Sequence, residues 1–404
     1  MQSKRSEFNG SGSTGNQSVT GVGFQPEFLI IISCLATTNT TLDDGHFVLG
    51  MASGSSDQQA IHMSDDGAQL TINSSRAQKS GKIICATNAN GSAVALEAAL
   101  VSFDADGFTI NWSVASSAKF HYIAMAGADF QAHVDSFDMN GSTGQQTVTG
   151  VPFQPKAVLF FGVIDNTTEG TTTSGKLSIG CATASNERWA LSLYNLDAQA
   201  ASVAKSYLTE SKCIVRTDHS AVTLAADFVA FTSDGFTVDI TTALACRMPF
   251  VCFGGSADFQ ANTVTQPTSN GAVAESGIGL APDAVILVGS KIATLDTITA
   301  DANTSFGWAD ENADESFLTL DIDDAAGVSD SRSAHNSNAC VVKVRADGDV
   351  TEAVAVMSSL DSDGFTLNWT TTNALASIIG YLAMGTGASP GGGGGGRAGW
   401  MWAA

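Results

Sequence analysis

Charged residues are scarce in this sequence, where they make up 14% of 404 residues, against about 25% in an average soluble domain. Basic residues are the scarcest, because 18 Lys and Arg stand against 40 Asp and Glu and leave a formal net charge of −22. Such a chain repels the phosphates of nucleic acids and of anionic lipids. We therefore expect no nucleic-acid partner, and a surface covered mainly by Ser, Thr, Asn, Gln and Gly.

Long apolar runs are also missing. The longest, Phe28 to Ala36, has less than half of the roughly 20 residues that a membrane-spanning helix needs. Met1 to Glu7 contains two basic residues with no apolar segment behind them, which is not the pattern of a secretory signal. We therefore expect no membrane insertion, and assembly in the cytoplasm.

The dominant feature of the chain is a threefold internal repeat. Asp-Gly-Phe-Thr occurs at residues 106–109, 234–237 and 363–366, at steps of 128 and 129 residues. An entry motif, Val-Thr-Gly-Val-x-Phe-Gln-Pro, occurs at 19–26 and 148–155 and is reduced to Gly-Leu-Ala-Pro at 279–282. A Gly-x-Ala triplet keeps the same register, beginning at Gly50, Gly180 and Gly307.

Each copy has the length of one ordinary domain and is far longer than a solenoid unit. We predict three tandem domains at residues 1–132, 133–262 and 263–388, followed by a glycine-rich tail at 389–404. Runs of Val, Ile, Phe and Thr alternate with clusters of Gly, Ser, Asn and Asp, which indicates strands and turns. The expected fold is all-β, with each copy an antiparallel, jelly-roll-like β-sandwich. In the first copy the expected strands lie near 17–22, 27–35, 46–52, 58–64, 68–73, 82–86, 93–103, 107–113 and 120–127.

The repeated Asp-Gly-Phe-Thr phrase predicts a β-hairpin. Asp-Gly supplies the positive φ angles of a tight turn, which gives Gly107, Gly235 and Gly364 the role of turn formers. Side chains alternate along the strand that follows, so Phe108, Ile110 and Trp112 share one face. The same face is apolar in the other copies, which predicts three buried strands; its residues are Phe236, Val238 and Ile240, and Phe365, Leu367 and Trp369.

Calcium binding is the alternative interpretation of these turns, through Asp104 and Asp106 or through Asp361 and Asp363. The second copy has Thr232 at the first of these positions, and the EF-hand pattern is absent, so the hairpin interpretation is favoured. A second acidic group lies in the third copy, at 310–315 with Asp321, Asp323 and Asp324. It predicts a solvated acidic edge, with a weak calcium site as the alternative.

Seven cysteines lie far apart, with no CxxC and no zinc-ligand spacing. Cys85, Cys213 and Cys340 are assigned to matching points of the three copies, inside apolar, strand-like runs. Because equivalent cysteines of separate domains cannot bridge within one domain, we expect buried free thiols.

Catalytic motifs are weak. Gly170 to Leu177 has the spacing of a phosphate loop, but Leu177 stands where Ser or Thr must hold magnesium, and the residues after it are strand-like. Ser202 and Lys205 match Ser-x-x-Lys without its companion motifs. A pair of glycosidase carboxylates cannot be recognised or dismissed among 40 acidic residues. We predict no enzymatic activity, no catalytic residue, no metal site and no cofactor.

The histidines and tryptophans carry no pattern of a site. The histidines are single and scattered, at His46, His62, His121, His133, His219 and His335, and no two have a metal-ligand spacing. Trp112 and Trp369 are in phase with the core, and core or rim packing is also expected for Trp189 and Trp308, rather than a sugar-binding platform.

The tail differs in kind from the repeats. Six glycines, 391–396, form a flexible tether to a tip that contains Trp400, Met401 and Trp402. Exposed tryptophans are costly in water, so the tip is expected to dock on a neighbouring subunit, with folding back on its own third domain or a frayed end as the alternatives.

The repeat units resemble those of structural proteins of tailed bacteriophages and prophages. The matching stretches are Val148 to Pro155, Ser362 to Trp369 and Gly380 to Gly385, and the resemblance covers all three copies but not the tail. It implies a virion component present in many copies, a homo-oligomer that contacts other virion subunits, as a head decoration, a fibre or a tail-associated protein. The alternative that we keep open is an adhesin whose sandwiches bind host-surface glycans weakly and gain by multivalency.

Overall fold

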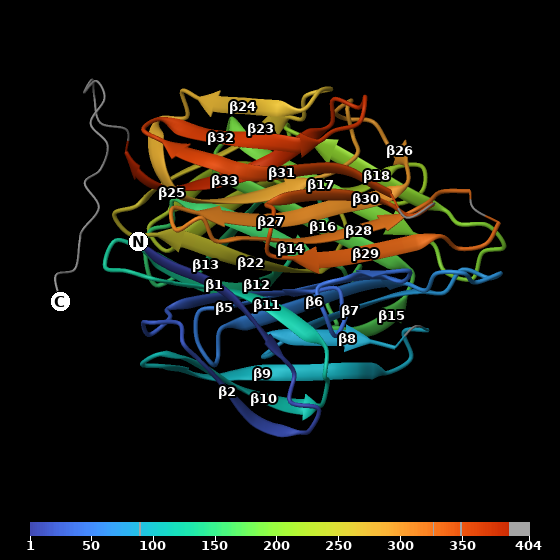
Figure 1. Cartoon of the computed structure of the whole chain (residues 1–404). Coiled ribbons are helices and arrows are strands. Elements are labelled where there is room, and N and C mark those ends of the chain that lie inside the picture. Colours follow the sequence, from blue (N-terminus) through green and yellow to red (C-terminus); the bar gives the residue numbers. More distant parts are fainter. Residues whose placement is uncertain (89, 326, 348–349, 388–404) are drawn as a thin grey trace.

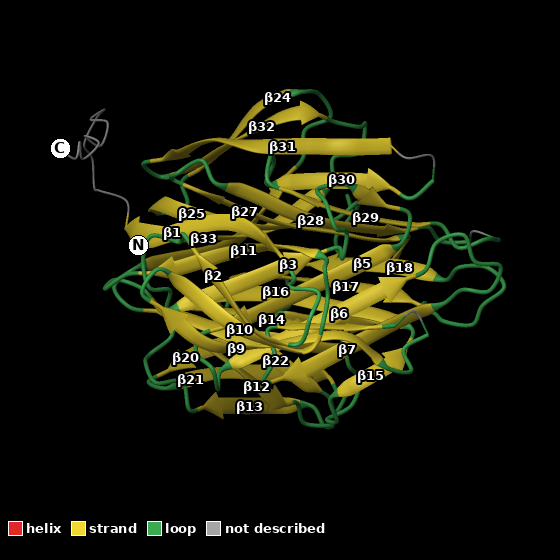
Figure 2. Ribbon diagram, turned by 60° about the horizontal axis from the view of Figure 1, so that its bottom comes forward, coloured by secondary structure: helices red, strands yellow, loops and turns green. Residues whose placement is uncertain are grey.

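The structure is a computed structural model that describes residues 1–88, 90–325, 327–347 and 350–387. All regular secondary structure in these residues is β-strand, and the strands form six antiparallel sheets (Figures 1 and 2). No helix within the described residues has the length and apolar character of a membrane span. The predicted all-β class and antiparallel sandwich architecture are confirmed.

The strands of the first copy build a seven-stranded and a four-stranded sheet. In spatial order the large sheet contains β1 (Gln2–Asn9), β11 (Lys119–Ala126), β3 (Phe28–Ser33), β5 (Gly45–Ala52), β6 (Gln58–Asp65), β7 (Ser74–Ser80) and β15 (Gly170–Thr173). The small sheet contains β2 (Gly15–Thr20), β10 (Gly107–Val114), β9 (Val94–Asp104) and β8 (Ile84–Thr87).

The same order of strands recurs twice more. The second large sheet is β12 (Gln131–Asp138), β22 (Arg247–Gly254), β14 (Ala157–Gly162), β16 (Gly175–Ala184), β17 (Glu187–Asn195), β18 (Ala204–Thr209) and β26 (Thr299–Ala300), and its small partner is β13 (Gly144–Thr149), β21 (Gly235–Thr242), β20 (Val222–Thr232) and β19 (Ile214–Thr217). The third large sheet is β23 (Asp258–Thr265), β33 (Ile378–Gly387), β25 (Leu280–Gly289), β27 (Ala302–Asp310), β28 (Glu315–Ile322), β29 (Ser331–Asn336) and β4 (Thr41–Leu42), with β24 (Gly271–Ser276), β32 (Gly364–Thr371), β31 (Val350–Asp361) and β30 (Val341–Arg345) as its small partner.

The seventh strand of each large sheet comes from another copy. Strand β15 of the second copy pairs with β7 of the first, β26 of the third pairs with β18 of the second, and β4 of the first pairs with β29 of the third. Along the chain, each exchanged strand falls between the second and third long strands that its own copy contributes to its large sheet. The exchange is therefore cyclic and joins the three copies into one closed body.

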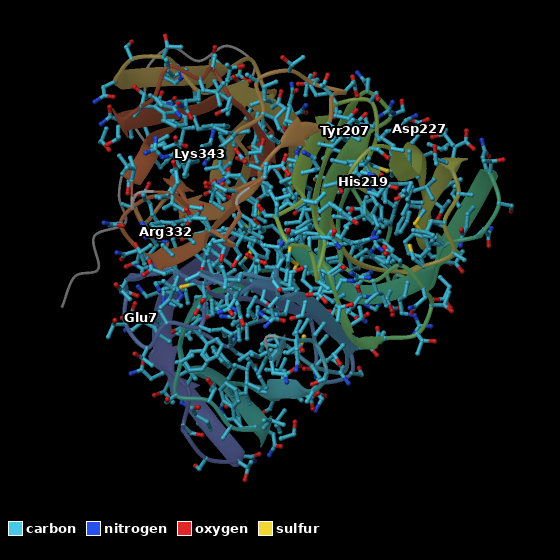
Figure 3. The ribbon with its side chains drawn as sticks, turned by 90° about the vertical axis from the view of Figure 1, so that its right-hand side faces the viewer. Glu7, Tyr207, His219, Asp227, Arg332 and Lys343 are labelled. Carbon is cyan, nitrogen blue, oxygen red and sulfur yellow. The ribbon has the colours of Figure 1, made fainter. Side chains whose placement is uncertain are left out.

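One hydrophobic core is shared by all three copies. Each large sheet turns one face to this common core, where, for example, Phe28, Leu159 and Ile286 are all fully buried. Its other face packs against its own small sheet in a separate core. Strands such as β3 and β14 are buried along their whole length for this reason. Figure 3 shows the three parts of the chain, blue, green and orange, around a common centre.

The predicted domain boundaries do not coincide with the ends of strands. The boundaries placed at 132/133 and 262/263 fall inside strands β12 and β23, because the sequence Ala-Asp-Phe-Gln-Ala, which occurs at 128–132 and 257–261, begins a copy rather than ending one. The chain folds as three sandwiches that exchange strands, and their treatment as separate domains stays a prediction. The tail at 389–404 lies outside the described residues.

The strand predictions for the first copy fail at three places. The segment 68–73 is a turn, and the strand that follows it is β7. Strands β1 and β4 were not expected. Strands β1 and β7 are polar, and β4 has only two residues. Each of the three strands therefore forms because a neighbouring segment pairs with it, and not because of its own hydrophobic pattern.

The predicted hairpin strands and their buried faces are correct. Phe108, Ile110 and Trp112 are buried, as are the six corresponding residues of the other copies. The predicted turn role of the three glycines is wrong. Gly107 pairs with Asp104 across a loop of Ala105 and Asp106, neither of which has a positive φ, and the glycines begin strands β10, β21 and β32. Gly107 and Gly364 have φ angles of 147° and 149°, whereas Gly235 has no positive φ. A stronger reason for glycine is close approach, because a Cβ at Gly107, Gly235 or Gly364 would lie 2.0, 1.9 or 1.9 Å from a carbonyl oxygen of the neighbouring strand.

The Gly-x-Ala triplet marks a close approach of the large sheet to the residue that precedes a strand of the small sheet, β8, β19 or β30. A Cβ on Gly50, Gly180 or Gly307 would lie 1.7, 2.0 or 1.6 Å from the carbonyl oxygens of Ile83, Cys213 and Cys340, respectively. Ile83, and not Cys85, is thus the counterpart of Cys213 and Cys340, so the predicted matching of Cys85 is wrong by two positions. All seven cysteines are buried free thiols, as expected.

Candidate functional site

The carboxylates of the Asp-Gly turns bind their own backbone. Asp106 accepts hydrogen bonds from the amides of Gly21 and Gly23, at 3.2 and 2.6 Å, and so fastens the entry motif to the hairpin. Asp104 accepts one from the Thr109 hydroxyl at 2.7 Å. Asp363 and Asp361 make corresponding bonds in the third copy. These contacts explain why the two motifs recur together, and the described residues contain no group of three or more His, Cys, Asp or Glu side chains placed to hold a metal ion.

The segment with phosphate-loop spacing is the exchanged strand of the second copy. Gly170 to Thr173 form β15, which pairs with β7 of the first copy. Lys176 begins the next strand and pairs with Asp165 at 2.5 Å. No helix follows the glycines, so the segment lacks the helix N-terminus that receives a phosphate in true loops of this kind.

The Ser-x-x-Lys segment also lies at a contact between copies. The Ser202 hydroxyl donates to the backbone carbonyl of Asp323, and Lys205 forms an ion pair with Asp324. Both partners belong to the third copy. These contacts account for the side chains without a catalytic role.

The acidic group of the third copy is distributed over such contacts and is not a single solvated edge. Asp310 accepts a hydrogen bond from the Ser3 hydroxyl at 2.6 Å, and Asp314 pairs with Lys4 at 3.3 Å. Asp321 is buried beside Lys291, at 2.7 Å. Burial, followed by repulsion from Asp321 and Asp301, raises the pKa of Asp323 to about 7.

Two histidine pairs form through the fold, although no spacing in the sequence indicates them. The Nδ1 of His46 and the Nε2 of His62 are 3.3 Å apart, and both side chains lie in the first copy. The rings of His121 and His335 meet between the first and third copies, with centroids 4.7 Å apart. Burial and the neighbouring His335 lower the pKa of His121 to about 3, and burial lowers that of His335 to about 4. Both rings are therefore neutral at pH 7.

Four tryptophans lie in the interior. Trp112 and Trp369 belong to the cores of their own sandwiches, as predicted. Trp189 and Trp308 belong to the common core, and the Trp189 indole donates to the Tyr381 carbonyl at 2.9 Å. None of the four provides a surface on which a sugar could stack. Trp400 and Trp402 lie outside the described residues.

Two neighbouring surface hollows occupy equivalent places in the first and second copies. The first, of about 550 Å³, is lined by Gln25, Pro26 and Phe103, and the second, of about 680 Å³, by Gln154, Pro155 and Phe231. Gln131 lines both hollows. One contains Glu27 and the other Lys156, so any ligand that suits both must be recognised without a fixed charge.

Three equivalent loops meet at the end of the body that lies on the right in Figure 1. They comprise residues 66–73, 196–203 and 323–330, with the exception of 326. Between the first two loops the Ile72 amide donates to the Gln199 carbonyl and the Ala198 amide to the Ile72 carbonyl, and the Ala325 amide donates to the Ser202 carbonyl. In each loop an alanine, Ala68, Ala198 or Ala325, has a φ of 58°. This left-handed conformation costs roughly 1–2 kcal/mol per residue and is held by the neighbouring loops.

The loop end also exposes apolar side chains. Leu70 is 78% exposed and Val328 is 43% exposed, whereas most other large apolar side chains among the described residues are covered. Two exposed apolar side chains at the place where the three loops meet make this end a candidate contact surface. Sequence patterns give no sign of it, because only the cyclic exchange of strands brings the three loops together.

Neither the family models nor the curated proteins give a relative for this chain. No protein-family model matches it, and a search of curated proteins finds no match.

Proposed function

We propose that the chain is a non-enzymatic structural protein of a bacteriophage particle, present in many copies as a head decoration, a fibre or a tail component. The observation that carries the proposal is the cyclic exchange of β4, β15 and β26 around one core. It turns three sandwiches into a single block that cannot come apart without breaking sheet hydrogen bonds. Such a block suits a part that transmits or resists force in a particle.

The contact surfaces of this block support assembly with other virion subunits and with further copies of itself. The loop end presents three equivalent segments with exposed Leu70 and Val328. The sequence resemblance supports the same role, since the motifs behind it are those that form the turns and the entry strands.

The proposal is tested on particles purified from cells that carry this gene. Peptide mass spectrometry should find the chain as a stoichiometric component, and electron cryo-microscopy should show it at symmetric positions with ordered contacts along most of its length. Its absence from purified particles would refute the proposal.

Binding of host-surface glycans is the second candidate, and the paired hollows favour it. Phe103 and Phe231 are half-buried rings beside exposed Gln25 and Gln154 amides, which together suit a neutral sugar. Glycan-array binding that is lost in a Phe103→Ala, Phe231→Ala double variant would support this candidate. Binding that is unchanged by the double variant would exclude the hollows.

A further inference from the structure

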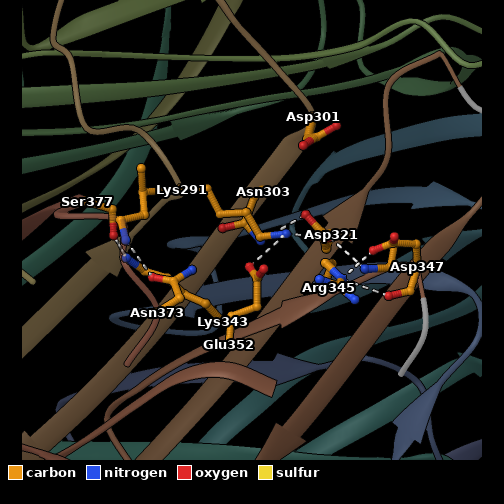
Figure 4. A network of polar contacts seen from close by, with 12 residues as sticks. Lys291, Asp301, Asn303, Asp321, Lys343, Arg345, Asp347, Glu352, Asn373 and Ser377 are labelled. Carbon is orange, nitrogen blue, oxygen red and sulfur yellow. Dashed lines mark hydrogen bonds and ion pairs between the residues drawn. The ribbon is translucent and has the colours of Figure 1, made fainter. Parts of the chain in front are cut away.

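Three charged side chains converge on one point of the third copy (Figure 4). Lys291 lies just after β25, Asp321 on β28 and Glu352 on β31. The Lys291 Nζ is 2.7 Å from Asp321 Oδ2 and 3.2 Å from Glu352 Oε2. The Asp321 side chain is fully buried, and those of Lys291 and Glu352 are each 16% exposed. An amine is thus held between two carboxyl groups and largely away from water.

Two hydrogen-bond donors also point at the Asp321 carboxyl group. The Asn303 side-chain amide donates to Oδ1 at 3.1 Å, and the backbone amide of Ala346 donates to Oδ2 at 2.7 Å. Donors fixed in this way polarise a carboxyl group and stabilise negative charge that develops on its oxygens. Asp321 therefore has the surroundings of an electrophile as well as those of an ion-pair partner.

We propose that Lys291 and Asp321 join in an intramolecular amide bond within the folded chain, with Glu352 as the carrier of protons. A carboxyl oxygen at hydrogen-bond distance places Cγ, one bond further on, close to the roughly 3–3.5 Å from which an attack can start. Enclosure in the protein removes the competing water and fixes the orientation. The reaction needs no oxidant, reductant or other co-reactant.

The bond forms by loss of one water molecule. Glu352 takes a proton from the Lys291 ammonium, and the free amine attacks Cγ of the protonated Asp321, so that a C–N bond forms and charge collects on the carboxyl oxygen. Glu352 then passes its first proton to the Asp321 hydroxyl, which leaves as water. The nitrogen loses its second proton to Glu352. Glu352 releases this last proton to solvent. Lys291 gives up two protons in all, and the C–O bond of Asp321 is the one that breaks.

The protonation states fit this sequence. Burial raises the pKa of Asp321 to about 6 against the opposing effect of Lys291, so a protonated population exists near neutral pH. Burial would lower the pKa of Lys291, but the carboxylates of Asp321 and Glu352 outweigh it and keep the amine charged. A proton acceptor beside the amine is therefore required, and Glu352 occupies that place.

Other lysine–aspartate pairs of the chain lack this combination. Lys176 pairs with Asp165, which is 25% exposed and also contacts Arg76 and Arg216. Lys212 pairs with Asp227, which is 26% exposed and shared with Arg188. Among the ion pairs of the described residues, Lys291 is the lysine that contacts two carboxylates, one of them fully buried.

Mass spectrometry of the denatured full-length chain tests the proposal directly. The wild-type mass should lie one water molecule below the sequence mass, and proteolysis should yield a branched peptide that joins Lys291 to Asp321. Lys291→Arg and Glu352→Gln, which keep the size of the side chains, should each restore the full mass. Lys212→Arg is the matched control and should keep the loss.

Each outcome decides part of the proposal. A wild-type chain of full mass, with Lys291 and Asp321 recovered in separate linear peptides, would refute the bond. A loss of water that persists in Lys291→Arg would place it elsewhere. A loss that persists in Glu352→Gln would overturn the role of Glu352. The wild-type measurement stands alone if a variant fails to fold.

Discussion

The buried pair of His121 and His335 should make the closed body sensitive to mild acid. His121 donates one hydrogen bond from Nε2 to the Asn39 Oδ1 at 3.0 Å, and His335 accepts one from the Cys34 amide at 3.2 Å. The rings lie between the first and third copies, which also meet through the exchange of β4 and through polar contacts such as Lys4 with Asp314. Protonation of either ring places a charge in a buried setting, where the Glu7 carboxylate, 3.7 Å from His121, attracts that charge but does not offset the effect of burial.

The sign of the effect follows from the lowered pKa values. A histidine whose folded pKa lies below its unfolded value of 6.5 contributes stability that is fully present above pH 6.5 and is lost as the pH falls through the folded pKa. With a folded pKa of about 3, His121 alone should cost roughly 2 kcal/mol between pH 7.5 and pH 5. His335 should cost about as much, and the two losses add to about 4 kcal/mol, because at pH 5 both rings are neutral in the folded chain and charged in the unfolded one.

Urea unfolding followed by tryptophan fluorescence measures this loss. A pH of about 5 keeps the chain above its isoelectric point of about 4.3, where it would be least soluble. His121→Gln and His335→Asn keep one polar group in the place of the bonded ring nitrogen and do not titrate. Buried carboxylates affect all chains alike, so the difference between wild type and variant isolates the histidines.

We expect the wild type to lose about 2 kcal/mol more than either variant between the two pH values. His219→Gln, at an exposed position, is the control and should follow the wild type. A wild type that loses no more stability than the double variant would refute the argument, because the two rings would then be accessible or otherwise compensated when charged.

Three further predictions concern the body as a whole. Gly180→Ala should destabilise the fold by about 1–3 kcal/mol in the urea titration, because the new Cβ would lie 2.0 Å from the Cys213 carbonyl oxygen. Gly54→Ala is the control, since the nearest atom to its Cβ is 3.5 Å away, and it should change stability by less than about 0.5 kcal/mol. Thr172→Pro in β15 should lower the melting temperature of the whole chain in one transition, and a separate early transition would show that the copies unfold independently. The seven thiols should react with a thiol reagent only after denaturation, and rapid reaction of any thiol in the native chain would contradict their burial.

The sequence predicts what each sandwich needs for itself. The Asp-Gly turn, the face of Phe108 and the close glycine Gly180 recur because every copy must make the same hairpin and the same contact between its two sheets. Strand alternation and turn residues are local properties, so they can be recognised without knowing the neighbours. The buried thiols follow from the same local apolar runs.

Contacts between copies could not be predicted in this way. Gly170 to Thr173 resemble a phosphate loop in sequence, yet they form a strand, because an edge of another copy is available to pair with them. The polar strand β7 is largely buried for the same reason. Which side chains meet across a boundary depends on the closure of the body, so the His121–His335 pair and the three-loop end leave no periodic trace in the sequence.

The contacts between copies also explain why the copies have diverged. Three identical chains around a threefold axis must repeat each contact three times, whereas a single chain can vary each one. One set of equivalent positions in the three copies holds Asp65, Asn195 and Ile322. Asn195 donates a hydrogen bond to the buried Asp65 at 2.8 Å, whereas Ile322 is apolar. Lys205 with Asp324 and Arg76 with Asp165 are likewise pairs that occur once. Such unlike pairs favour one cyclic order of the copies over the other, since a swapped order would bury Asp65 against an apolar residue and deprive its carboxyl group of the Asn195 donor.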